Sequence, residues 1–351
     1  MTPRIIRRAT VLLAASALLL SGCAATPIPA PGPAEELRLG YFDTVTHAPA
    51  LVGVQKHFFT EALGNTTFST QIFSAGPAAV EALSAGAIDA AYIGPSPAVN
   101  TFIQSRGASA TIVAGAATGG AALVVRKGIT SAADLDGATL ASPQLGNTQD
   151  VALRSWLRDE GYTTSTTGGG DVKVSPTDSS VTLSLFQAGK IDGAWLPEPW
   201  ASRLVLEAGA HVLVDEASLW DDGDFPTTVL LVRKDFLRDH PETVTALLTG
   251  HTASVAWLNA NPTEAAAAIN AELLADTGKA LTDPVINRAL EHVRFSIDPL
   301  AATFPVSLRA ARAAGIGQDG DLNGLFDLSL LNAVIADAGG DPVSAGGLGR
   351  Q

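Results

Sequence analysis

The chain has 351 residues, a hydrophobic fraction of 46% and a formal net charge of −13. This acidic balance does not suit nucleic acid as a partner, because phosphates would be repelled. The length is more than one hydrophobic core usually serves and therefore favours two lobes.

The N-terminus has the order of a secretory signal. Three arginines precede an apolar run over residues 11–20, which is too short to span a bilayer, and a small-residue cleavage site follows. Cys23 is the single cysteine, so no internal disulfide can form. Residues 20–23, Leu-Ser-Gly-Cys, resemble a bacterial lipobox, in which the cysteine is lipidated. We therefore expect a signal peptide over residues 1–22 and an extracytoplasmic protein that Cys23 anchors to the cell membrane.

Residues 23–36 have the composition of a tether. Prolines alternate with small residues in this segment, which favours extended, solvated chain and cannot build a core. The first lobe then begins with a strand predicted over residues 37–42 and a helix over residues 49–59. A second strand, over residues 67–73, leads to Gly76-Pro77, where a proline at the first helical position suits another helix.

One pattern occurs twice along the chain. Residues 80–97 and 183–200 align without a gap and share Ala-Gly, Ile-Asp and a proline-rich end. Each copy predicts a helix ended by glycine, a short buried strand with an aromatic residue, and a loop at the strand's carboxyl end. Ligands bind at that end of the strands in open α/β sheets. The repeat predicts two α/β lobes that face each other across a cleft, although a duplicated packing unit without a ligand would give the same pattern.

Two apolar, β-branched runs are best placed to cross between the lobes, residues 121–126 and 228–233. Between them, a strand at residues 138–142 is followed by a helix within residues 147–160, and after residue 233 the chain reads as successive helices on the first lobe. The expected divisions are residues 37–124 with 229–340 for lobe I, residues 125–228 for lobe II, and residues 341–351 for a flexible tail.

Catalytic and metal-binding signatures are scarce. The chain has no Gly-x-Ser-x-Gly elbow, and its one cysteine is assigned to the lipobox. The six histidines include no pair at helical ligand spacing. Residues 319–330 match the first half of an EF-hand loop, but Leu330 stands where a bidentate glutamate is needed. We expect no metal, no cofactor and no enzymatic activity.

Several loops that precede helices are rich in hydroxyl and amide groups. Helix N-termini carry unpaired N–H groups and a partial positive charge, which is how neutral side chains can hold an anion. Ser96, Asn147 and Thr148 could each be a plain N-cap, so the convergence of the loops carries the prediction. The candidate binding residues are Thr46, His47, Gly76, Ser96, Gln144, Asn147, Thr148, Gln149 and Thr228.

The second copy of the repeat adds three candidates, Trp195, Glu198 and Trp200. The two tryptophans suit the apolar wall of a pocket, and they suit the core nearly as well. The carboxylate of Glu198 would repel an anion unless it meets an ammonium, a hydroxyl or a nearby base. Because the candidate loops contain no Lys or Arg, an anion of low charge density or an uncharged polar solute is favoured over a phosphate.

Four segments together resemble the solute-binding lipoproteins of ABC importers for aliphatic sulfonates, in a group that also includes taurine, nitrate and thiamine-precursor binders. The segments are residues 46–59, 88–95, 141–154 and 197–200. The resemblance runs from about residue 37 to residue 339 and implies a type II periplasmic-binding-protein fold, with two α/β lobes joined by two crossing strands. It also implies that an anionic head group sits against Thr46, Ser96, Asn147 and Thr148, with Gln149 beside them. His57 departs from the glycine expected at its position.

The resemblance implies that the chain captures an aliphatic sulfonate and delivers it to the permease and ATPase of an importer. A receptor for taurine, nitrate or a pyrimidine thiamine precursor is the alternative. A more remote alternative is an enzyme of the thiamine-pyrimidine synthase type. Such an enzyme needs a lysine and a reactive histidine in the cleft, and the loops here offer only His47. A purely structural lipoprotein is the last alternative. In each case we expect a monomer.

Overall fold

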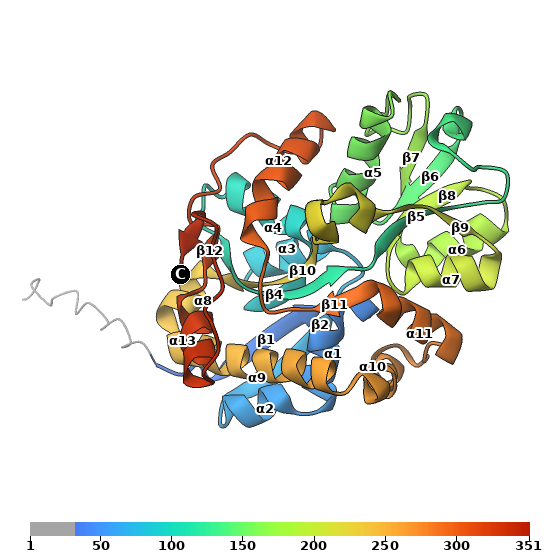
Figure 1. Cartoon of the computed structure of the whole chain (residues 1–351). Coiled ribbons are helices and arrows are strands. Elements are labelled where there is room, and N and C mark those ends of the chain that lie inside the picture. The colour runs from blue at the N-terminus through green and yellow to red at the C-terminus, as the bar shows by residue number, and fades with distance from the viewer. Residues whose placement is uncertain (1–31) are drawn as a thin grey trace, which may run out of the picture. The chain divides into compact units, whose positions relative to one another are not determined.

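Two β-sheets organise residues 32–351, the part of the chain that the computed structural model describes (Figure 1). The expected signal peptide, the lipidation site Cys23 and most of the tether lie outside the described residues. Within the described part, no helix has both the length and the apolar character needed to cross a membrane.

The first sheet has eight strands in the order β13-β12-β4-β10-β3-β1-β2, with β11 paired to β4. Its strands are β1 (Glu36–Tyr41), β2 (Thr67–Ile72), β3 (Ala90–Ile93), β4 (Ala110–Gly119), β10 (Pro226–Arg233), β11 (Val293–Phe295), β12 (Phe326–Asp327) and β13 (Gly349–Arg350). The helices that share its core are α1 (Ala48–Gln55), α2 (Phe58–Leu63), α3 (Gly76–Ser84), α4 (Pro95–Gln104), α8 (Lys234–Asp239), α9 (Pro241–Ala260), α10 (Pro262–Thr277), α11 (Asp283–His292), α12 (Phe304–Ala313) and α13 (Ser329–Asp337).

The second sheet has five strands in the order β7-β6-β8-β5-β9. Its strands are β5 (Ala121–Val125), β6 (Thr139–Ser142), β7 (Lys173–Pro176), β8 (Gly193–Pro197) and β9 (His211–Asp215). Three helices cover it, namely α5 (Thr148–Asp159), α6 (Ser179–Gln187) and α7 (Trp200–Ala208). Short 3-10 turns complete the chain at η1 (Val45–His47), η2 (Ala132–Leu135), η3 (Glu216–Leu219), η4 (Asp221–Gly223) and η5 (Ala301–Thr303).

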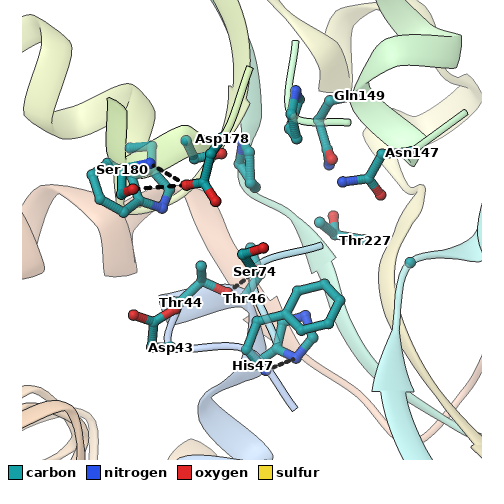
Figure 2. A pocket seen from close by; sticks show the side chains of 16 residues that line it. Asp43, Thr44, Thr46, His47, Ser74, Asn147, Gln149, Asp178, Ser180 and Thr227 are labelled. Atoms are coloured by element: carbon teal, nitrogen blue, oxygen red, sulfur yellow. Dashed lines mark hydrogen bonds between the residues drawn. The ribbon is translucent and has the colours of Figure 1, made fainter. Parts of the chain in front are cut away.

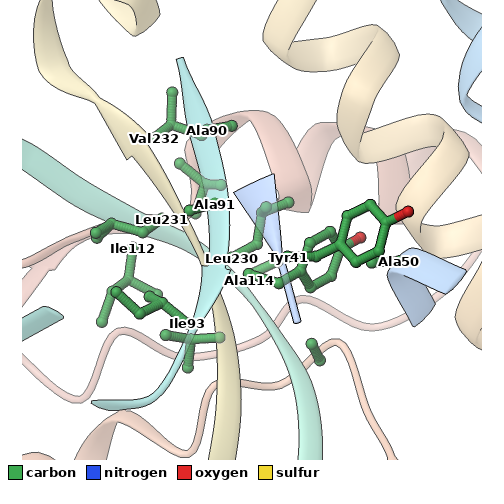
Figure 3. Packing of buried hydrophobic residues seen from close by; sticks show 14 of the residues in the cluster. Tyr41, Ala50, Ala90, Ala91, Ile93, Ile112, Ala114, Leu230, Leu231 and Val232 are labelled. Atoms are coloured by element: carbon green, nitrogen blue, oxygen red, sulfur yellow. The ribbon is translucent and has the colours of Figure 1, made fainter. Parts of the chain in front are cut away.

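The core of the first sheet lies around β3 and β10. Every residue of β3 is buried, and so is every residue of β10 except Arg233. Leu231 pairs with Ala91 and Val232 with Ala90, so that large aliphatic side chains stand beside small ones (Figure 3). Helices on both faces explain why these strands read as continuous apolar runs instead of alternating ones.

The duplicated pattern is confirmed as two helix–strand–helix units, α3-β3-α4 and α6-β8-α7. In each unit the first helix ends just before a glycine in the left-handed region, with φ of +71° at Gly86 and +67° at Gly189. A side chain at either position would be strained, which explains the repeated Ala-Gly.

The repeated Ile-Asp has a structural task in both units. The carboxylate of Asp89 accepts the backbone N–H of Arg38 at 3.0 Å, and that of Asp192 accepts the backbone N–H of Thr139 at 2.7 Å. Each aspartate therefore joins its own strand segment to the neighbouring parallel strand. Part of the repeat thus belongs to sheet construction and not to a ligand.

The crossings between the sheets lie earlier in the chain than the sequence predicted. Residues 121–126 were expected to cross, but β5 lies wholly in the second sheet, paired with β8 and β9. The first crossing is at Gly119 and Gly120, whose φ values of +72° and +69° allow the abrupt turn. The second precedes Pro226, so the predicted run 228–233 lies within β10 of the first sheet.

Residues 341–351 differ from the expected flexible tail. The backbone of Gly349–Arg350 pairs in parallel with Phe326–Asp327, and Ala345 is fully buried. Strand pairing and burial of a small side chain fix this segment against the first sheet.

Candidate functional site

A cavity lies where the loops at the carboxyl ends of strands from both sheets converge (Figure 2). Its volume of about 140 Å³ is below the roughly 300–1,000 Å³ of pockets for drug-sized ligands, which favours a small solute. Residues from the first-sheet side are Phe42, Asp43, Thr44, Thr46, His47, Ser74, Gly94 and Thr227. Residues from the second-sheet side are Pro143, Asn147, Gln149, Asp178, Ser179, Ser180, Pro197 and Trp200.

His47 is a neutral donor in the first-sheet wall. Its ring stacks on Phe42 with centroids 4.2 Å apart, and its Nδ1 accepts the backbone N–H of Phe42 at 3.2 Å. Burial lowers the pKa of His47 to about 3, so the ring carries one proton. Because Nδ1 accepts, that proton is on Nε2, which is a donor without a partner among residues 32–351.

Hydroxyl groups follow β1 on the same wall. The hydroxyls of Thr44 and Thr46 lie 3.2 Å apart, and both side chains are buried. Thr227 of β10 also lines the cavity, and its hydroxyl donates to the carbonyl of Gly119 at the first crossing. These groups give the first-sheet wall neutral polar atoms and no cationic side chain.

The start of α5 forms the opposite wall. Asn147 caps this helix, because its Oδ1 accepts the backbone N–H of Thr148 at 2.9 Å, and both Asn147 and Gln149 are buried. The carboxylate of Asp150 shapes the loop before the helix by accepting from the hydroxyl of Ser142 at 2.7 Å and the backbone N–H of Gly146 at 3.0 Å. The amide side chains and the helix N-terminus can bind a small anion.

Two carboxylates also line the cavity. Burial raises the pKa of Asp43, and the nearby charge of Asp178 raises it further. Asp178 is exposed and caps α6 by accepting the backbone N–H and the hydroxyl of Ser180 at 2.9 and 2.7 Å. No Lys or Arg is among the lining residues of the described chain, so these negative charges have no cationic partner within the cavity wall.

Five of the residues expected from the sequence lie in the cavity wall, namely Thr46, His47, Asn147, Gln149 and Trp200. The structure does not place the other seven there, namely Gly76, Ser96, Gln144, Thr148, Trp195, Glu198 and Thr228. Each of these seven has another role or position in the fold.

Three of the seven lie at helix starts beside the cavity. The hydroxyl of Thr148 accepts the backbone N–H of Ser96 at 3.3 Å, so these residues join α4 to α5. Gly76 lies so close to Pro97 that a Cβ on it would be 2.3 Å from that ring. The sequence identified the right helix starts but not the direction in which each side chain points.

The remaining four are not part of the cavity wall. Trp195 is fully buried against Trp156 and donates its indole N–H to Glu216 at 2.7 Å, so it belongs to the core. Thr228 is fully buried, and the neighbouring residue of β10 lines the cavity instead, because side chains alternate along a strand. Gln144 is exposed. Glu198 is buried against Arg288 of α11, 3.2 Å away.

Sequence reasoning missed the loop that precedes α6. Asp178, Ser179 and Ser180 line the cavity, and they follow β7 in the same way that the predicted residues follow their strands. The signal was present, because an acid-hydroxyl run between a strand and a helix is the pattern used for the other loops.

Two α/β sheets that both line one cavity define the class of two-lobed α/β proteins. The chain belongs to the NMT1-like family, whose model matches residues 30–275. It is 30% identical over 199 residues to the taurine-binding periplasmic protein of Escherichia coli (strain K12), an alignment that covers 56% of this chain and 59% of that protein. The match therefore spans less than two thirds of the relative's length.

Solved structures share the fold. The alkanesulfonate-binding protein SsuA from Xanthomonas axonopodis pv. citri, bound to MOPS, superposes with a TM-score of 0.68 at 21% identity, covering 82% of this chain and 96% of that one. The periplasmic nitrate-binding protein NrtA from Synechocystis PCC 6803 gives 0.68 at 17% identity, covering 82% and 83%. At these identities the likeness establishes the type II periplasmic-binding-protein fold.

Proposed function

We propose that this chain is the extracytoplasmic solute-binding component of an ABC importer and that it binds a small sulfonate-class solute in the cavity between its two sheets. The permease and ATPase of the importer are its partners, Cys23 is its lipid anchor, and the chain acts as a monomer. The observation that carries the proposal is the cavity itself, which both sheets line with hydroxyl and amide groups at helix starts.

The two sheets are the two lobes in this proposal, with boundaries at Gly119–Gly120 and just before Pro226. Each lobe supplies about half of the lining residues, so a bound solute contacts both. The solute then stabilises the arrangement in which the lobes are close together, and binding energy becomes a population shift.

The composition of the cavity supports binding without chemistry. A neutral His47, with its Nδ1 already bonded, is a hydrogen-bond donor and a poor base. The wall has no lysine or cysteine that could act as a nucleophile. These observations favour a receptor over an enzyme of the same fold.

One observation favours a second candidate, a solute that carries both an anionic and a cationic group. Asp43 and Asp178 line the cavity, and their mutual repulsion contributes to the raised pKa of Asp43. An ammonium group placed near them would relieve that repulsion, whereas a plain alkanesulfonate would not. An aminosulfonate of the taurine type carries an ammonium group for the two carboxylates and a sulfonate for the amide groups at the start of α5.

Taurine and ethanesulfonate test the two candidates, because they differ in one amino group. Isothermal titration of residues 24–351, in buffer free of sulfonates, should detect at least one of them. If the second candidate is right, Asp43→Asn weakens taurine binding roughly tenfold, the size expected for a lost charged contact, and leaves ethanesulfonate unchanged or tighter. Asp341→Asn removes an exposed carboxylate outside the cavity and is the control.

Binding of nitrate alone, or of a pyrimidine alone, would keep the role and replace the solute. If neither taurine, nor ethanesulfonate, nor nitrate, nor a pyrimidine binds, the proposed function is contradicted. Turnover of a bound compound would contradict the receptor assignment.

A further inference from the structure

Glu198 lies between two cavity-lining residues but points away from the cavity. Pro197 ends β8 and Trp200 begins α7, and both line the cavity wall. The side chain of Glu198 is only 3% exposed, and its Oε2 accepts the backbone N–H of Ser202 in the first turn of α7 at 3.0 Å. This carboxylate therefore fixes the loop that presents Pro197 and Trp200 to a solute.

The other carboxylate oxygen reaches a helix of the opposite sheet. Arg288 of α11 donates from one guanidinium nitrogen to Glu198 Oε1 at 3.2 Å and to the hydroxyl of Ser202 at 2.8 Å. Helix α11 packs against α7 and continues at His292 directly into β11 of the first sheet. The pair thus bridges the two sheets, and its partners belong to opposite walls of the cleft.

We propose that Glu198 and Arg288 form a closure latch, a positioning pair that makes solute binding dependent on contact between the loop before α7 and α11. This inference rests on the proposed function, because it concerns the closing of two lobes around a solute. Neither residue touches the cavity; they act through the position of Trp200 and through the approach of the lobes.

The energetics of the pair are asymmetric. In the described structure Glu198 is desolvated, and burial raises its pKa, while Ser202, Arg288 and the charge of His292 favour the carboxylate. A buried carboxylate without a cation is strongly unfavourable. Arg288 is 20% exposed and can return to water when the lobes separate. Loss of Arg288 therefore penalises the closed form much more than the open form, whereas loss of the Glu198 charge removes the need for a partner.

The test is a double-mutant cycle with Glu198→Gln and Arg288→Met in residues 24–351, with affinity for taurine and ethanesulfonate as the readout. We expect Arg288→Met to lower the affinity for whichever solute wild type binds by roughly tenfold or more. Glu198→Gln should lower that affinity less. The double variant should resemble Glu198→Gln, because the unpaired carboxylate is then absent. Arg238→Met removes half of an exposed ion pair on α8 and is the control.

Thermal unfolding without solute distinguishes a pair that acts on closure (a latch) from one that only stabilises the fold (a structural brace). A latch leaves the unliganded melting temperature of Arg288→Met within the range of Arg238→Met, because opening relieves the unpaired charge. An unchanged affinity combined with a lowered melting temperature would overturn the latch and make the pair an ordinary brace.

If wild type binds neither taurine nor ethanesulfonate, the sulfonate part of the proposed function fails, and the latch is judged by solution X-ray scattering. Arg288→Met should then have a larger radius of gyration than wild type and Arg238→Met. Equal radii for the three proteins would overturn the latch as well.

Discussion

The hydroxyl oxygen of Thr148 accepts the backbone N–H of Ser96 at 3.3 Å and so joins the first turns of α4 and α5, two helices that belong to different sheets. The approach is tight, because a Cβ on Gly94 would lie 2.4 Å from that same oxygen. Gly94 and Asn147 line the cavity beside this contact. The two helix starts can meet only because residue 94 has no side chain.

Gly94→Ala is therefore expected to weaken solute binding while the fold is retained. The φ of Gly94 is −69°, which alanine adopts without strain, so the main effect of the added methyl group is its collision with Thr148. We expect a roughly tenfold loss of affinity, since an overpacked contact costs about 1–3 kcal/mol. The unliganded melting temperature should stay close to wild type, because the lobes can separate.

Gly169→Ala is the matched control, with its nearest neighbour at 3.7 Å, an ordinary contact. Titration calorimetry and thermal unfolding on the three proteins check the prediction. Wild-type affinity in Gly94→Ala would show that the α4–α5 contact does not accompany binding.

The repeat allowed much of the fold to be predicted from the sequence, for physical reasons. A glycine that ends a helix, as at Gly86 and Gly189, and a short apolar strand after it are local features that propensity and periodicity describe. The crossings were misplaced because Ala121–Val125 is equally apolar in either sheet, and only its pairing with β8 and β9 decides the assignment.

The site was predicted less completely, because the facing of a side chain depends on tertiary contacts. Capping chemistry predicts the helix starts at residues 96 and 148. In the structure, however, the backbone N–H of Ser96 donates to the hydroxyl of Thr148, so this pair is engaged with itself and not with a solute. The sequence makes Trp195 a candidate for the cavity wall, whereas its indole N–H donates to Glu216, 21 residues later, and lies in the core. Such partners have no local signature.

A buried ion pair beneath the α5 loop makes the second prediction. Asp150 and Arg154 lie 3.0 Å apart with side-chain exposures of 0% and 1%, and the same carboxylate holds Ser142 and Gly146. Arg154→Met leaves that carboxylate buried without its cation, so the free energy of unfolding should fall by about 3–5 kcal/mol.

Arg158→Met is the control, because it makes the same change one helical turn later. Arg158 pairs with Asp159 in an exposed position, and such changes are usually within about 0.5 kcal/mol. Urea unfolding of both variants gives the comparison. Similar losses in the two proteins would mean that the buried pair contributes no more than a surface pair.

Glu216 supplies the last prediction, a pH-dependent stability. Its carboxyl is buried in η3 just before the second crossing, and burial raises its pKa to about 7 despite the indoles of Trp195 and Trp220 that favour the charged form. The nearby charge of Asp215 contributes to the rise. The folded protein therefore holds this proton at pH values where the unfolded chain, with an ordinary glutamate pKa of 4.5, has lost it.

The sign follows from that difference in bound protons. Between pH 4.5 and 7 the folded state binds more protons at Glu216, so each unit of rising pH lowers the stability of wild type relative to Glu216→Gln by about 1.4 kcal/mol. Below pH 4.5 and above pH 7 the difference is constant, because both states then carry the same charge. Urea unfolding at a series of pH values measures the difference in stability between wild type and Glu216→Gln. Glu160→Gln, at an exposed position, is the control. A pH-independent difference between wild type and Glu216→Gln would mean that Glu216 titrates normally and that the segment before the second crossing admits water.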